Sequence, residues 1–119
     1  MSSLEETDKA SLAVVKSPST RVSLADIEAN IAGEFSGTAD KLFTGSPTPE
    51  PMRLLSVHII VLKNGFTVIG KSAPADAQNF DAELGRRFAR EDAVRQIWPL
   101  MGYALREKLA SSGVGQALS

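Results

Sequence analysis

Apolar and polar residues alternate most regularly in the second half of the chain. Two runs rich in β-branched residues, 54–62 and 66–72, flank Asn64-Gly65, a dipeptide that favours the two-residue type I′ turn. The pattern predicts an antiparallel β-hairpin over 54–72. A two-residue loop would also fix the pairing register.

That register decides which side chains share a face, since it places Val61 opposite Val68. One face of the hairpin would carry Val57, Ile59, Val61, Phe66 and Val68. The other would carry Leu54, Ile60, Leu62 and Ile69, with Ser56, His58, Thr67 and Lys71 between them. A hairpin that is apolar on both sides needs cover on both, and one helix cannot supply it. We therefore expect either the N-terminal helix or another subunit on the second face.

Residues 77–110 repeat apolar side chains at helical spacing, with Asp76 or Asn79 as candidate caps. Pro99 removes a backbone donor inside this run. We expect a kink there, or a second helix with Pro99 in its first turn.

The first half of the chain is less regular. Ser23 and Asp26 have the spacing of a capping box, and a stripe of apolar residues follows, so 23–43 is predicted to be helical. The Pro-rich segment 44–53 is predicted to be an extended linker. Polar residues 1–22 are predicted to form a flexible tail, whose few apolar residues could still dock, and 111–119 a frayed one.

These elements predict one α+β domain over 23–110. It would consist of a short N-terminal helix, a two-stranded antiparallel β-hairpin and a long Pro-kinked C-terminal helix or helix pair. Such a core is marginal for a single copy, which favours self-association. The residues predicted to form the interface between copies are Ile60, Leu62, Ile69, Trp98, Met101 and Leu105.

Charge and composition narrow the chemistry. Thirteen basic against fourteen acidic residues leave no overall field that would attract nucleic acid or an anionic membrane. The absence of cysteine excludes disulfides and thiolate catalysis and suits a reducing cytoplasm. The acidic start of the chain lacks a secretory pattern, and its apolar runs are too short to span a bilayer.

Few residues are candidates for a chemical role. His58 is the only histidine, and no Ser, Cys or carboxylate partner can be assigned to it from the sequence. The acidic residues lack metal-ligand spacing, and no glycine-rich phosphate loop is present. We therefore predict no catalytic residue, metal or cofactor. A small enzyme is only the third hypothesis for the function, after the two binding functions given below.

Arg86 and Arg90 lie one helical turn apart, and Lys71 could join them if the hairpin folds back on the helix. Guanidinium groups bind phosphates in bidentate geometry, so these three form a candidate anion site for a nucleotide-type ligand. The alternative is a solvated helix face neutralised by neighbouring acids. A nucleic-acid-binding accessory factor could use the same arginines and would bind in a strongly salt-dependent way.

Two segments resemble a known family. Residues 62–109, with LKNGFTVIGK, NFDAELGRRFAR and IWPLMGYALR, and residues 23–40, with SLADIEANIAGEF, are similar to a family of small tailed-bacteriophage proteins. That family is named after gene products of the phages N-four and S-f-six. The chain departs from its usual pattern at Ile69 and Lys71, and over 73–76, where a cysteine-containing stretch is common.

The resemblance implies a phage or prophage origin and carries over no catalytic residues. We expect a non-enzymatic accessory binding protein of the host cytoplasm, a host-takeover or counter-defence factor. It would act as a dimer or larger oligomer on a host protein or a nucleotide-type signal.

Overall fold

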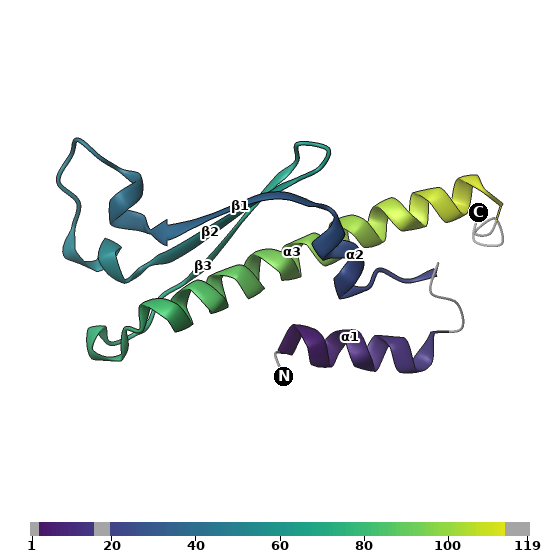
Figure 1. Ribbon diagram of the computed structural model, residues 1–119, viewed down its shortest axis with the longest axis horizontal. Coiled ribbons are helices and arrows are strands. Elements are labelled where there is room, and N and C mark those ends of the chain that lie inside the picture. Colours follow the sequence, from purple (N-terminus) through teal and green to yellow (C-terminus); the bar gives the residue numbers. More distant parts are fainter. Residues whose placement is uncertain (1–2, 16–19, 114–119) are drawn as a thin grey trace. The chain divides into compact units, whose positions relative to one another are not determined.

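The computed structural model describes residues 3–15 and 20–113 of the 119 in the chain (Figure 1). The fold is α+β, as predicted. In chain order, the helices and strands are α1 Ser3–Val14, α2 Leu24–Ala29, β1 Ile31–Thr38, β2 Ser56–Leu62, β3 Thr67–Ser72 and α3 Ala82–Ser111. Short 3-10 turns cover Ala39–Leu42, Glu50–Leu54 and Ala77–Asn79.

The chain divides into two compact units, which are described separately. The sheet unit is Ile31–Val94, with all three strands and the first part of α3. The helical unit consists of the described residues of Met1–Asn30 and Arg95–Ser119, with α1, α2 and the rest of α3.

The sheet has three antiparallel strands in the order β1-β2-β3, so the predicted two-stranded hairpin is incomplete. The added strand, β1, lies inside the segment 23–43 that was predicted to be helical. Phe35 of β1 pairs with Ile59 of β2, and Ile59 pairs with Ile69 of β3. A bulge at Ala32 shifts the register at the start of β1.

The loop between β2 and β3 corrects the predicted register. The described residues have no positive φ outside glycine, so Asn64 cannot occupy a type I′ turn, whereas Gly65 has a φ of 90°. Gly65 N–H donates to Leu62 O at 2.9 Å and Leu62 N–H to Phe66 O at 2.8 Å, which makes a three-residue loop. Asn64 Oδ1 accepts from Phe66 N–H at 2.9 Å.

The longer loop moves the pairing by one residue, so Val61 lies opposite Thr67 and Ile60 opposite Val68. Consequently, Val68 joins Ile60 and Leu62 on one face of the sheet, and Ile69 joins Ile59 and Val61 on the other. We call these the covered face and the open face.

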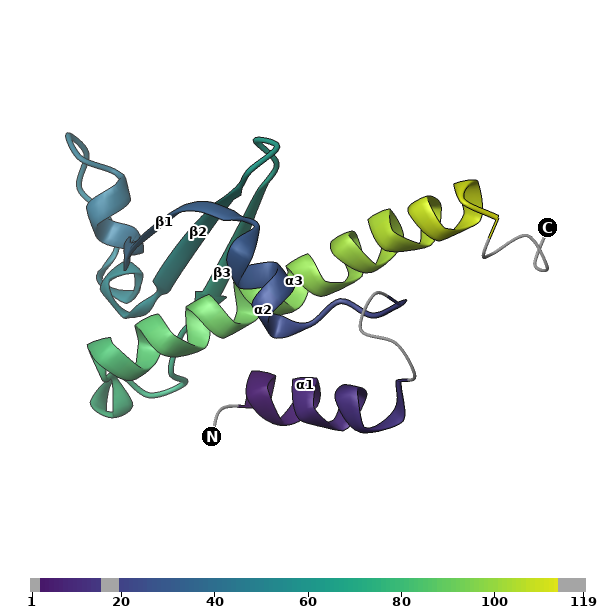
Figure 2. The ribbon, with the colours of Figure 1, turned by 45° about the vertical axis from the view of Figure 1, so that its right-hand side comes forward.

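Helix α3 packs on the covered face (Figures 1 and 2). The contact is close because two glycines face it: a Cβ on Gly70 would lie 2.1 Å from Ala89 O, and one on Gly85 would lie 2.4 Å from Ser56 Oγ. The buried apolar residues of this layer are Ile60, Leu62, Val68, Ala89, Ala93 and Val94.

Helix α3 continues through Pro99, so the predicted pair of helices is in fact one. Pro99 has no N–H, which leaves the carbonyl of Arg95 without its usual helical donor. The predicted kink at Pro99 stays a prediction. Within the described residues, no helix is long and apolar enough to cross a membrane.

In the helical unit, α2 begins at the predicted capping box. Asp26 N–H donates to Ser23 Oγ at 3.0 Å, and Ser23 N–H donates to Asp26 Oδ2 at 2.9 Å. However, α2 ends at Ala29, because the chain then enters β1.

Helix α1 occupies residues predicted to be a flexible tail, and its one buried residue is Leu4. The predicted tail residues 1–2 and 16–19 lie outside the described residues, as do 114–119 of the predicted frayed end. The predicted extended linker 44–53 contains most of the 3-10 turn Glu50–Leu54.

Candidate functional site

The open face of the sheet exposes two large apolar side chains, Phe35 and Ile69. The three strands place nine residues on this face, two of them glycines, in rows that run across the sheet: Gly37, Val57 and Lys71; Phe35, Ile59 and Ile69; Gly33, Val61 and Thr67. Val57 is buried, at 6% exposure. Phe35 is 64% exposed and Ile69 is 56% exposed. Lys71, at one corner, is the single charged residue among the nine.

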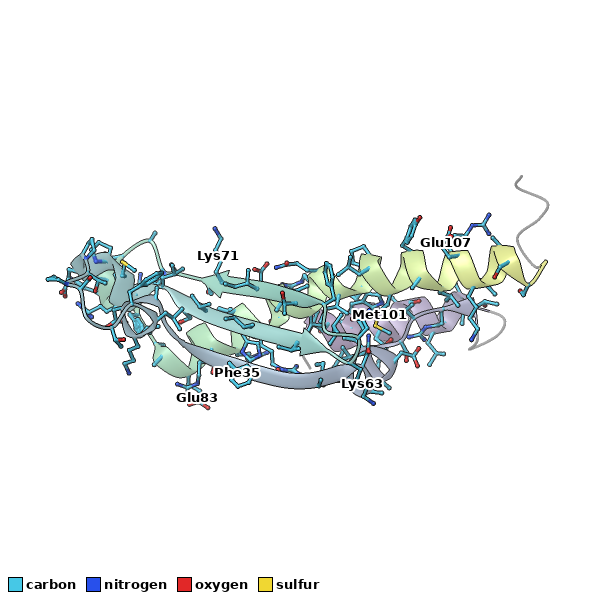
Figure 3. All side chains as sticks on the ribbon, turned by 90° about the horizontal axis from the view of Figure 1, so that it is seen from above. Phe35, Lys63, Lys71, Glu83, Met101 and Glu107 are labelled. Atoms are coloured by element: carbon cyan, nitrogen blue, oxygen red, sulfur yellow. The ribbon has the colours of Figure 1, made fainter. Side chains whose placement is uncertain are left out.

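The edge strand β1 gives this face its shape. On this face of β1, Phe35 lies between Gly33 and Gly37. The Phe35 ring lies beside Gly33, with its Cε2 atom 3.4 Å from where a Cβ on Gly33 would be. An aromatic ring laid across an edge glycine shields backbone that has no side chain of its own. Figure 3 shows Phe35 and Lys71 on the two edge strands, β1 and β3.

The covered face holds a polar cluster instead. Glu34 of β1 lies on the same face as His58 of β2, and its Oε1 is 2.7 Å from His58 Nε2. Arg90 of α3 donates to the same carboxylate twice, from Nε to Oε1 at 2.7 Å and from Nη2 to Oε2 at 3.3 Å. The Arg90 hydrogen bonds lower the pKa of Glu34, partial burial opposes them, and His58 adds to the lowering.

This cluster joins α3 to the edge strand β1. His58 is 7% exposed, and its Nδ1 is buried with no hydrogen-bond partner in the described structure. A neutral His58 must carry its proton on Nε2 to donate to Glu34, which leaves Nδ1 as a lone pair facing protein. Both oxygens of Glu34 are bonded, so the cluster anchors the helix to the edge strand.

The three residues predicted to bind an anion are separated. Arg90 is engaged by Glu34 at the β1 side of the sheet, while Lys71 is on β3, at the opposite edge and on the open face. The Lys71 backbone N–H donates to Asp92 Oδ2 of α3 at 3.0 Å. Arg86 is exposed on α3.

The six residues predicted to form an interface are also divided. Ile60 and Leu62 are in the core of the covered face, at 0% and 4% exposure, whereas Ile69 is on the open face. Trp98, Met101 and Leu105 belong to the helical unit and are half-buried.

Sequence reasoning missed the contributions of Phe35, Glu34 and Asp92. The signal for the first two is the alternation from Ile31 to Thr38, in which two glycines would each cost a helix about 1 kcal/mol. The same residues also fit a helical stripe, which hid the strand. Nothing near Asp92 in the sequence indicates that its partner is a strand backbone.

A hollow beside Ser56, Leu84 and Gly85 has a volume of about 140 Å³, below the range of about 300–1,000 Å³ for small-molecule sites. Among the described residues, no group of three His, Cys, Asp or Glu is placed to hold a metal ion.

Comparison with known proteins agrees with the resemblance found in the sequence. No curated protein and no solved structure is significantly similar to the chain. The family model described as "Phage protein (N4 Gp49/phage Sf6 gene 66)" matches residues 22–109, which is well over half of the chain. The chain therefore belongs to the N4 Gp49/phage Sf6 gene 66 family of phage proteins.

Proposed function

We propose that this phage-family chain is a non-enzymatic accessory binding protein that works as a homodimer, with the two copies joined through their open sheet faces. The observation that carries the proposal is the exposure of Phe35 and Ile69 on a face with one charged residue among nine. Sheets in proteins commonly bury such a face against another layer. A second copy is the occupant to which this face is best matched.

The match follows from the strand order. Rotating a copy by 180° about an axis parallel to β2 exchanges β1 with β3 and lays β2 over β2. Residues in one row then stay in one row, so Phe35 would lie over Ile69 of the second copy, and Ile59 over its equivalent. Each contact occurs twice, as symmetric dimers require. Two sheets packed in this way align within about 30°.

Charge and size fit the same arrangement. Lys71 would lie over Gly37 of the second copy, in the row that those residues share. Glycine leaves room for the aliphatic stem of the lysine, whose ammonium group can reach water at the rim. No two lysines of this face would be opposed.

The polar cluster supports a non-enzymatic role, since its histidine is buried and its carboxylate is held by Arg90. In the host cytoplasm, a phage protein of this kind would act by engaging a host protein or a nucleotide-type signal. Arg86, which is exposed, remains a candidate from the predicted anion site.

The test is the mass of the protein in solution. Sedimentation or light scattering of the full chain should give twice the 12.7 kDa of one copy. Phe35→Glu and Ile69→Glu should each return the mass to one copy, because they bury a carboxylate in the apolar interface.

Phe43→Glu is the matched control, since Phe43 is 58% exposed but lies outside the strands. It should leave the mass unchanged. A wild-type chain that stays monomeric as its concentration rises would overturn the proposal, and so would a dimer that survives both open-face substitutions.

A further inference from the structure

The helical unit contains a groove that the proposed function does not use. It has a volume of about 430 Å³, inside the range of small-molecule sites. Arg21, Asp26 and Asn30 lie on one side, and Met101, Leu105 and Lys108 of α3 lie on the other. Met101 is labelled in Figure 3.

Arg21, one of the two cations in this groove, has a hydrogen-bond donor without an acceptor in the described part of the chain. The Arg21 side chain is 8% exposed and donates from Nη2 to Asp8 of α1, while its Nε is buried with no partner in the described part of the chain. A buried donor without an acceptor costs about 1–3 kcal/mol. An acceptor brought by a ligand would recover that cost.

Two further donors line the same groove. Asn30 Nδ2 lies 3.6 Å from Met101 Sδ, and a thioether is a weak acceptor. The ammonium group of Lys108 is on the last turns of α3, at an exposed position. The groove therefore has an amide and two cationic groups with donors to offer.

The acids nearby are already engaged. Asp26 accepts from the Ser23 N–H in the capping box. Asp8 accepts from Leu24 N–H at 3.0 Å and from Arg21; partial burial alone would raise its pKa, but these two donors together hold the pKa below its usual value. Asp26 Oδ2 and Asp8 Oδ1 are therefore in use as acceptors, whereas Arg21 Nε has no acceptor among the described residues.

The rest of the lining is apolar and consists of Val22, Met101, Ala104 and Leu105. We infer that the groove binds an amphiphilic anion, a single carboxylate or phosphate group on an apolar body. The anionic group would contact Arg21 Nε and Lys108, and the body would lie along Met101 and Leu105. This inference does not depend on the proposed dimer, because every residue in it belongs to the helical unit.

Binding can be followed without a label. Trp98, the only tryptophan of the chain, donates from Nε1 to Val22 O at 2.9 Å, and Val22 lines the groove. The experiment titrates the full chain with octanoate and with octyl phosphate while the indole emission is recorded. Octanol supplies the body without charge, and inorganic phosphate supplies the charge without a body.

We expect a saturable change in emission with octanoate, octyl phosphate or both, and binding at least about tenfold weaker with octanol and with inorganic phosphate. The stronger of the two anions identifies the headgroup. Equal binding of octanol would overturn the inference, since the groove would then be merely apolar. No saturable change with either anion would also overturn it.

Variants separate the two cations. Lys108 is exposed, and Lys108→Gln should weaken the binding of both anions about tenfold. Lys63 lies on the hairpin loop, and Lys63→Gln should bind the anions as the wild type does. Arg21→Gln should abolish binding, and its helical circular dichroism checks its folding. If Arg21→Gln does not fold, Lys108→Gln decides. Unchanged affinity in Lys108→Gln contradicts the proposed headgroup contact, whatever the mass of the protein in solution.

Discussion

The two faces of the sheet are made from alternating residues of the same three strands, yet they have opposite environments. On the covered face, Ile60 and Val68 are buried, and Gly70 lets α3 approach the backbone. On the open face, Phe35 and Ile69 are more than half exposed although they are equally apolar. Hydrophobicity alone therefore does not decide which face a helix covers. The covered face differs in having the close approach of α3 at Gly70 and the polar anchor at Glu34.

The largest expected effect comes from filling the space that α3 uses. In Gly70→Ala, the new Cβ would lie 2.1 Å from Ala89 O and 2.5 Å from Ala93 N, so the helix must move away. Overpacking of this kind should lower the free energy of unfolding by about 3 kcal/mol or more. Chemical denaturation measures it.

Gly37→Ala is the matched control on the open face, where a Cβ would meet nothing within 4 Å. Neither glycine has a positive φ, so the two substitutions differ only in the space available to the new methyl group. We expect a change within about 0.5 kcal/mol for Gly37→Ala. Equal costs for the two substitutions would mean that α3 does not pack on the face that contains Gly70.

Truncation of isoleucine should show the next largest difference. Ile60 is fully buried, so Ile60→Ala should cost about 3 kcal/mol through lost burial and a cavity. Ile69 is 56% exposed, and Ile69→Ala should cost about 1 kcal/mol or less in dilute protein. If the open face is a dimer interface, the cost of Ile69→Ala should grow with protein concentration, while that of Ile60→Ala should not.

Much of this architecture could be predicted from local sequence. The runs around Asn64-Gly65 indicated paired strands, the spacing of Ser23 and Asp26 located a helix start, and residues 77–110 were recognisable as helical. Each of these signals depends on residues that are near one another in the sequence. Local propensity is sufficient where the neighbours that an element needs are close in sequence.

Long-range pairing explains the main errors. Residues Ile31–Thr38 form a strand because β2 lies beside them, more than 15 residues further along the chain. The register error has a smaller cause: Asn64-Gly65 fits both a two-residue and a three-residue loop, and one extra loop residue moves Ile69 to the opposite face from Ile60.

The open face could be anticipated only in part. The sequence indicated a sheet that is apolar on both sides and named Ile69, but it also named Ile60 and Leu62, which the register places in the core. It could not pair His58 with Glu34, because Glu34 was assigned to a helix. The Arg90 contact depends on the same strand and was missed for the same reason.

The polar anchor of the covered face, Glu34, should make the free energy of unfolding depend on pH. Glu34→Gln removes the charge that Arg90 contacts, and should cost about 1–3 kcal/mol at neutral pH. Because the pKa of Glu34 is lowered in the folded protein, its stabilisation is fully present above the pKa of the unfolded chain and is lost as the pH falls through the lower pKa of the folded protein. The gap between wild type and variant should therefore narrow in acid, as denaturation at several pH values would show.

Glu50→Gln is the matched control, because Glu50 also pairs with an arginine, Arg53, but both side chains are exposed. Pairs of this kind contribute about 0–1 kcal/mol. A gap for Glu34→Gln that is as small as that for Glu50→Gln, or that widens in acid, would contradict the anchoring role of Glu34.

The smallest expected effect concerns the outer edge of β3. Helix α3 contacts this edge as well as the covered face. Asp92 of α3 accepts from the Lys71 N–H, so an edge amide that would otherwise face water or another strand is occupied. Asp92→Ala should cost about 1 kcal/mol and speed hydrogen exchange at the Lys71 amide. Glu107→Ala, at an exposed position far along α3, should leave that exchange unchanged. Unaltered exchange in Asp92→Ala would mean that the edge of β3 is protected without α3, and that the helix closes only the covered face.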